Sequence, residues 1–196
     1  MGVSVPYVCM GKEVILRAVV KLIATRGPEQ TSVRNVAAEA GVSIGAVQHY
    51  YKTKDDLLLA AMRSLNEYFS VKMEAVLGEI PDPKAKLRVF LHELAAIRPQ
   101  AREGAVIWTV FAARACVHEG LRAEHSANWD RTENVIFELL CAAFPNVDVT
   151  RDDAAYLLAL SDGIAVSMAA EHNKRMNQQR AQQLIDAALT HIAQRA

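Results

Sequence analysis

Hydrogen-bonding and small side chains gather in a short segment near the start of this 196-residue chain, and their types suit contact with the edges of nucleic-acid bases. Gln48 can form two hydrogen bonds with adenine, while Gly45 and Ala46 let a backbone approach closely and present a methyl group to thymine. Lys52 and Lys54 follow at once, where their ammonium groups can reach phosphates. These residues indicate a nucleic-acid contact.

The charge distribution supports this interpretation, although the net charge of the chain is zero. Up to Lys54 there are 7 Lys and Arg against 3 Asp and Glu, and the rest of the chain has 15 against 19. A cationic head suits phosphate contact, whereas an acidic body is repelled by the same nucleic acid. We therefore predict a nucleic-acid-binding domain over residues 12–54 and a separate body over residues 55–196, after a flexible leader over residues 1–11.

Patterns typical of catalysis, metal binding or membrane insertion are absent from the sequence. The three cysteines lie far apart, without a Cys-x-x-Cys pair or a histidine at the spacing of a metal ligand. No nucleophile has a neighbouring base, and no apolar run approaches the ~18 residues of a membrane span. We expect a cytoplasmic protein that is not an enzyme and has no metal, cofactor or membrane contact. A helical-bundle enzyme is the alternative from another class.

The spacing of apolar residues predicts an all-α chain of about nine helices. Two of them are short and lie between residues 32 and 51, with Thr31 or Ser32 and then Ser43 as N-caps. The other expected helices cover residues 12–26, 54–77, 84–97, 105–118, 121–144, 152–173 and 177–194.

The two short helices are too small to bury an apolar core alone, so they need the first helix as a third wall. This three-helix unit is the scaffold of a helix-turn-helix motif, whose second short helix enters the major groove of DNA. Backbone amides at the start of the first short helix, near Thr31 and Ser32, can bind a phosphate as well.

Three stretches in this region resemble the DNA-binding signature of the TetR repressor family. They are Thr31 to Ala37, Gly41 to Ser43 and Gly45 to Leu57. The resemblance implies that Tyr50 and Lys54 contact phosphates. Gln48 stands where the family often has a Tyr, and Ile44 replaces a frequent Lys or Arg, which leaves the operator sequence open.

The residues predicted to contact DNA come from both short helices and the segment that follows them. They are Thr31, Ser32, Arg34, Ser43, Ile44, Gly45, Ala46, Gln48, His49, Tyr50, Lys52 and Lys54. Tyr51 is expected in the core instead, and His49 can also be a surface residue without a role in binding. The alternative, a helical hairpin that does not bind DNA, fits the motif poorly.

The acidic body resembles the family in architecture, and Trp108, Phe111 and Trp129 are similar to the subset that includes the choline-responsive repressor of betaine synthesis. The resemblance implies an effector cavity among the middle helices. Aromatic and Met residues concentrate there, and a few polar residues lie beside them as candidate anchors. The predicted ligand-binding residues are Phe69, Met73, Phe90, Trp108, Phe111, Arg114, Trp129, Glu133 and Asp162. For each anchor alone the alternative is a salt bridge or a surface position, and for each aromatic residue it is plain core.

The last two expected helices each carry an apolar stripe, and the resemblance implies that they form a dimer interface. The stripes are Ala155, Leu158, Asp162, Ala165, Val166 and Ala169 in the first, and Ala181, Leu184, Ile185, Ala188 and Ile192 in the second. Two such faces from each subunit would build a four-helix interface around a two-fold axis, through residues 152–173 and 177–194. The alternative is that both stripes pack inside the monomer.

Together these features predict a dimeric repressor that binds a pseudo-palindromic double-stranded DNA operator. A small, largely apolar effector would release it by displacing the long helix that begins at Lys54 and continues from the DNA-binding head. The alternative is a helix-turn-helix regulator without a small-molecule effector, whose body serves only dimerisation or protein partners.

Overall fold

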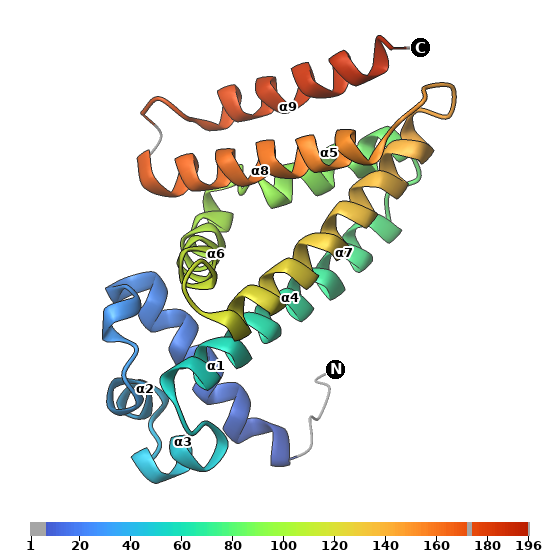
Figure 1. Cartoon of the computed structure of the whole chain (residues 1–196). Coiled ribbons are helices and arrows are strands. Elements are labelled where there is room, and N and C mark those ends of the chain that lie inside the picture. Colours follow the sequence, from blue (N-terminus) through green and yellow to red (C-terminus); the bar gives the residue numbers. More distant parts are fainter. Residues whose placement is uncertain (1–6, 172–173, 196) are drawn as a thin grey trace.

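The computed structural model describes residues 7–171 and 174–195, and within these ranges all long regular elements are α-helices (Figure 1). The helices are α1 (Tyr7–Arg26), α2 (Val33–Ala40), α3 (Ile44–Tyr50), α4 (Lys54–Gly78), α5 (Pro83–Leu94), α6 (Arg102–Ala115), α7 (Glu119–Ala143), α8 (Arg151–Glu171) and α9 (Gln178–Ala193). Two short 3-10 turns, η1 (Pro28–Gln30) and η2 (Pro99–Ala101), precede α2 and α6. The predicted all-α fold is confirmed.

The first helix begins earlier than the sequence predicts. It starts at Tyr7, whereas the apolar spacing predicts a start at Lys12. Residues 7–11 of the expected leader are therefore helical, and its residues 1–6 lie outside the described residues.

Side-chain caps set the boundaries of the two short helices. Ser32 and Ser43 accept hydrogen bonds from the backbone amides of Asn35 and Ala46, at 3.2 and 3.1 Å. Between the helices Gly41 has φ of 67°, a left-handed conformation that favours glycine. The start of α4 is a capping box between Thr53 and Asp56. These local signals orient α3 relative to α2.

Replacement of Ser43 by Ala is expected to destabilise the protein by about 0.5–2 kcal/mol, because the amide of Ala46 loses its acceptor. Urea denaturation measures the change. Ser64, which is exposed in the middle of α4, provides the matched control, because its replacement by Ala removes no cap. Equal stabilities for the Ser43 variant and the natural protein would contradict the assigned cap.

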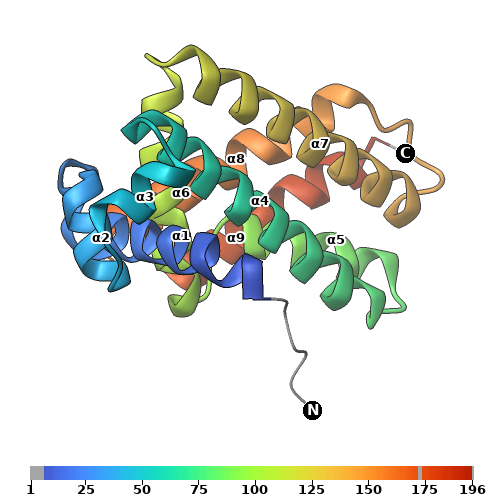
Figure 2. The same ribbon diagram turned by 90° about the horizontal axis from the view of Figure 1, so that it is seen from below.

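The helices α1, α2 and α3 form a head around one apolar cluster, and α2 and α3 lie together beside α1 (Figure 2). The side chains of this cluster are not all from the head. Leu57 and Leu58 of α4, Ile107 and Phe111 of α6 and Leu121 of α7 complete it. The head core is thus shared with the body.

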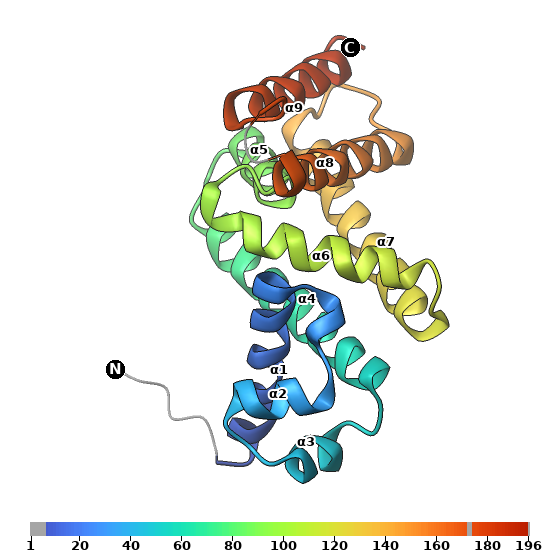
Figure 3. The same cartoon turned by 90° about the vertical axis from the view of Figure 1, so that its left-hand side faces the viewer.

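The body consists of α4 to α9, and α8 is its most enclosed helix. It packs against α5, α6, α7 and α9, and most of the second apolar cluster surrounds it. Figure 3 shows α6 crossing the molecule between the head and the pair α8 and α9. By length and composition α8 is the one helix among the described residues that could cross a membrane, and half of its apolar window is buried in the protein.

Candidate nucleic-acid interface and cavity

The exposed face of α3 carries the residues that the sequence assigns to base contact. Val47 is buried against the head, which leaves Gln48 and His49 exposed on the outer face together with Gly45. Ile44 is 46% exposed, an unusual position for a large apolar side chain. This surface offers a hydrogen-bonding amide and apolar groups but no ammonium or guanidinium group of its own. It matches the small and polar groups that the end of a recognition helix needs.

The neighbouring tyrosines point in different directions. Tyr51 is only 8% exposed and lies in the head core, whereas Tyr50, the last residue of α3, is exposed. The ring of Tyr50 rests near the start of α1, with the Lys12 Nζ atom 5.5 Å from the ring centroid. A Cβ atom on Gly11 would stand 3.3 Å from the Tyr50 hydroxyl, so a glycine there leaves room for the ring.

Lys12 is a basic residue that sequence reasoning did not include in the interface. It adds an ammonium group to the surface formed by Tyr50 and the exposed Lys52. No local pattern could have found it, because Lys12 and Tyr50 are far apart in the chain and meet only in the folded head.

Two predicted phosphate contacts are engaged with the protein itself. Thr31 is fully buried, and its hydroxyl and its amide both donate to the carbonyl oxygen of Pro28, at 2.5 and 3.2 Å. Thr31 was predicted as a possible cap of α2 and as a DNA contact. Instead it does not cap α2, and it presents no free donor to solvent. Lys54 donates to the same carbonyl oxygen at 3.0 Å. Ser32 and Arg34 are exposed as expected.

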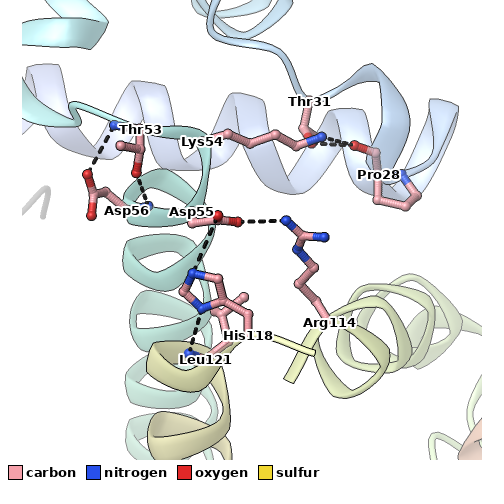
Figure 4. A network of polar contacts seen from close by, with 9 residues as sticks. All are labelled: Pro28, Thr31, Thr53, Lys54, Asp55, Asp56, Arg114, His118 and Leu121. Atoms are coloured by element: carbon pink, nitrogen blue, oxygen red, sulfur yellow. Dashed lines mark hydrogen bonds and ion pairs between the residues drawn. The ribbon is translucent and has the colours of Figure 1, made fainter. Parts of the chain in front are cut away.

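The first turn of α4 is bonded on two sides (Figure 4). Lys54 binds the η1 turn of the head through Pro28, and Asp55 binds the end of α6 through Arg114. The Nη2 atom of Arg114 lies 3.0 Å from Oδ1 of Asp55, and Nε2 of His118 lies 3.4 Å from Oδ2. Arg114 was expected to anchor a ligand, and it lies instead in this ion pair outside the cavity.

A cavity of about 490 Å³ lies among α4, α6, α7 and α8, with Val20 of α1 on its wall. Five of the nine predicted ligand-binding residues line it, namely Phe69, Trp108, Phe111, Trp129 and Asp162. Met73 and Phe90 are buried in the apolar cluster of the body instead, at 3% and 4% exposure, and Glu133 does not line the cavity. The cavity therefore has an aromatic wall, but it contains fewer of the predicted residues than the sequence suggests.

Asp162 is a half-buried carboxyl group in this wall. Burial raises its pKa to about 7, and a hydrogen bond from the Trp129 side chain opposes part of the rise. Behind the wall, the His125 ring lies between the two tryptophans, 5.8 Å from Trp108 and 4.4 Å from Trp129. Burial lowers the pKa of His125, and neither of its ring nitrogens has a hydrogen-bond partner among the described residues.

Sequence reasoning missed most of the polar lining. Asn66, Asn128 and Thr132 contribute hydrogen-bonding groups, and the charged lining residues besides Asp162 are Lys72, Glu93 and Glu103. Lys72 and Glu93 form an ion pair of 2.7 Å across α4 and α5. Their pairing depends on how these two helices cross, which no spacing within either helix reveals.

The described residues contain no group of three or more His, Cys, Asp or Glu placed to hold a metal ion. The aromatic rings and the separated polar groups of the cavity wall suit the binding of a small molecule.

The outer faces of α8 and α9 differ from the stripes that the sequence predicts. Most stripe residues pack inside the chain, for example Leu158, Ala165 and Ile185, because α8 is surrounded by other helices. The exposed side of α8 consists of Val166 from the stripe and four positions outside it, which are Tyr156, Ala159, Gly163 and Ala170. Leu184 of α9 is exposed as well. An apolar outer face exists, but Val166 and Leu184 are the only exposed residues of the predicted stripes.

Two protein-family models match the chain. A model described as bacterial regulatory proteins of the tetR family matches residues 15–61. A second model, described as the C-terminal part of the BetI-type transcriptional repressor, matches residues 83–194. The first match runs from the middle of α1 to the start of α4, and the second covers α5 to α9.

Individual proteins agree with these matches. The chain is 30% identical over 154 residues to the HTH-type transcriptional regulator PksA of Bacillus subtilis, which covers 78% of this chain and 75% of that protein. It is 27% identical over 158 residues to the HTH-type transcriptional regulator BetI of Proteus mirabilis, covering 78% and 77%.

Solved structures share the fold. A transcriptional regulator from Rhodococcus has a TM-score of 0.81 and 28% identity, over 93% of this chain and 96% of that chain. A regulator from Saccharomonospora viridis in complex with choline has a TM-score of 0.84 and 21% identity, over 93% and 97%.

Proposed function

The chain belongs to the TetR family of bacterial transcriptional regulators, and on this premise we propose that it is a homodimeric repressor that a small effector releases from its operator. The observation that carries the proposal is the pairing of two features in one chain. An exposed, capped recognition helix lies at one end, and a cavity of ligand size lies behind α6. Family members regulate transcription and are not enzymes, and as in the family we place this protein in the cytoplasm.

In the proposed complex α3 enters the major groove of double-stranded DNA. Gln48 and the apolar Ile44 read base edges, while Tyr50, Lys52 and Lys12 lie beside them for contact with phosphates. Lys54 bonds to the carbonyl oxygen of Pro28 through one of its three N–H donors, and the other two can contact a phosphate. Thr31 takes no part, because both of its donors are already bonded.

The proposed effector is a small molecule with a largely apolar body and a positively charged group. A volume of about 490 Å³ falls within the usual range of ligand pockets. Asp162 and Glu103 line it with carboxyl groups while Glu93 is paired with Lys72, and the aromatic rings of Trp108 and Trp129 in its wall can bind a cation. The choline bound to the Saccharomonospora viridis regulator is a molecule of this kind in a protein of the same fold.

The proposed dimer forms through the outer faces of α8 and α9. The small residues Ala159, Gly163 and Ala170 let two helices approach closely, and Tyr156 and Val166 add apolar area. An interface around a two-fold axis would place two heads on the two halves of a pseudo-palindromic operator.

Replacement of Val166 by Glu is expected to weaken the dimer at least ~100-fold, because two carboxylates lose water without gaining a partner. Sedimentation equilibrium measures the dissociation constant. The matched control is Val71, which is more exposed but lies on α4, where Glu is expected to leave the dimer intact. A Val166 variant that is still fully dimeric would place the interface elsewhere.

The function itself is tested by selection of DNA from a random pool with the purified full-length protein. Recovery of a pseudo-palindrome, bound with an affinity that falls steeply with salt, is the expected result. Choline and other small quaternary amines are then added to the bound complex, and release of the DNA is measured by fluorescence anisotropy. If no DNA is selected, the proposal that the protein is a DNA-binding regulator is contradicted. If DNA is selected but none of the added ligands releases it, the result favours a regulator without an effector.

A further inference from the structure

Two consecutive residues join the first turn of α4 to two different parts of the molecule. Lys54 bonds to the head through the carbonyl oxygen of Pro28 at 3.0 Å, and Asp55 bonds to the body through Arg114 at 3.0 Å and His118 at 3.4 Å (Figure 4). The head and the body therefore meet in polar contacts at one turn of one helix.

The body side of this contact is a stiff corner between α6 and α7. The guanidinium group of Arg122 donates to the carbonyl oxygens of Ala115 and Cys116, at 3.3 and 3.0 Å. His118 caps α7, because its Nδ1 atom accepts from the amide of Leu121 at 3.3 Å. The end of α6 and the start of α7 are thereby tied together, so that Arg114 and His118 move as one unit.

The same helix α6 forms part of the cavity wall. Trp108 and Phe111 line the cavity, and Arg114 follows Phe111 by about one turn on nearly the same face. Since a helix of this length is stiff, a shift of the wall at Trp108 also displaces the Arg114 end. The cavity and Asp55 are thus connected through a single element.

We propose that Asp55 is the positioning residue through which α6 holds the DNA-reading head, so that a displacement of α6 at the cavity changes the head's affinity for DNA by way of Arg114 and His118. The inference rests on the proposed regulator function and adds the residue that links its two sites. The three side chains are each about a third to a half exposed. Ion pairs of this kind contribute little to stability, which suits a contact that must form and break.

A second physical connection between the cavity and the head runs through apolar packing, and the experiment has to distinguish it from the polar contact at Asp55. Val20 of α1 lines the cavity, and Ile107 and Phe111 of α6 pack in the apolar cluster of the head. Displacement of α6 can therefore reach the head through apolar packing alone. The two routes differ in one respect, namely whether the carboxylate of Asp55 is needed.

A double-mutant cycle with operator binding as its readout separates the two routes. The full-length protein carries a cavity substitution, Trp108→Ala or Gly104→Leu, alone or combined with Asp55→Asn. A side chain at Gly104 meets no heavy atom within 4 Å at its Cβ position, so it can be added without a clash there. The DNA is the sequence selected by the natural protein, and fluorescence anisotropy measures its dissociation constant.

At least one cavity substitution is expected to change the operator dissociation constant about fivefold or more in the natural background. The same substitution is expected to change it less than about twofold when Asp55 is Asn. Arg114→Gln, which breaks the contact from the other side, should cause the same loss of coupling, and Asp55→Glu should restore part of it. Arg63→Gln is the matched control, because it breaks another ion pair between α4 and α7, with Glu124 at 2.7 Å, and should leave the coupling intact.

Equal effects of the cavity substitutions with and without the Asp55 carboxylate would overturn the inference in favour of apolar packing. The absence of any effect on operator affinity from either cavity substitution would overturn it as well. Thermal denaturation checks that each variant folds, and Trp108→Phe replaces a variant that does not. If no DNA is selected at all, the proposed function fails before the cycle begins, and this outcome is distinct from additivity.

Discussion

Replacement of Asp162 by Asn is expected to stabilise the protein at pH 8 by up to about 4 kcal/mol in the free energy of unfolding. The pKa of this carboxyl is raised from 3.8 to about 7 in the folded protein, and each unit corresponds to about 1.4 kcal/mol. Asn keeps an acceptor for the hydrogen bond from Trp129 but carries no charge that burial could disfavour.

The sign of the pH dependence follows from the raised pKa. At a pH below 3.8 the carboxyl is neutral in both the folded and the unfolded chain, so the natural protein and the variant should have similar stability. Between pH 3.8 and about 7 the unfolded chain releases the proton while the folded chain retains it, and the natural protein loses stability with each step in pH. Above about pH 7 the difference is constant.

Urea denaturation at pH 5, 6 and 8 measures this trend. Asp153→Asn is the control, and its effect on the free energy of unfolding is expected to have the opposite sign. Burial tends to raise the pKa of Asp153, but hydrogen bonds from Arg195 and Thr150 outweigh it and the pKa is lowered. This variant should therefore be destabilised at neutral pH, and the loss should fade as the pH drops through the carboxyl range. A stability gain for Asp162→Asn that does not depend on pH would show that the buried charge is not its cause.

Replacement of Gln48 by Ala is expected to weaken operator binding about 10-fold to 100-fold, and to relax the sequence preference at one base pair of each half-site. The side chain is exposed on α3, and a base-reading amide contributes about 1–3 kcal/mol of discrimination. Anisotropy titrations against operators with single substitutions measure both effects.

The matched variant is Lys52→Gln, since this side chain is exposed just beyond α3 and is proposed to contact phosphate. It should weaken binding to all sequences by a similar factor and lower the salt dependence of log K by about one phosphate contact in each subunit. The Gln48 variant should leave the salt dependence unchanged. If the two variants behave alike in both assays, α3 does not read bases in the proposed way.

Local signals in the sequence are sufficient to predict the two short helices of the head, but not the first turn of α1. The caps at Ser32 and Ser43 and the glycine turn between them depend only on neighbouring residues, so their pattern predicts the two short helices. The start of α1 does not follow from such signals. Gly11 weakens a helix by up to about 1 kcal/mol, which favours a start after it, but Tyr50 packs at that position in the folded head.

The cavity and the outer face of α8 show why residue types alone predict a site incompletely. Phe90 and Trp108 have similar chemistry, yet one lies in the core and the other at the cavity, because the crossing of the helices decides which side each presents. Apolar and small residues occur on most sides of α8, so helical periodicity could not distinguish its inner face from its outer one. Arg114 lies near the cavity along the sequence of α6, but the end of that helix projects past the cavity to Asp55.

The shared core of the head bears on how such regulators can be recombined. Ile107, Phe111 and Leu121 belong to the body by sequence, yet they complete the apolar cluster of α1, α2 and α3. A chimera that joins residues 1–54 of another regulator to this body must therefore match these three side chains and those of α4 in the same cluster, such as Leu57 and Leu58, as well as the operator. The DNA specificity of one regulator is therefore transferred more readily by substitutions on the exposed face of α3 than by exchange of the whole head.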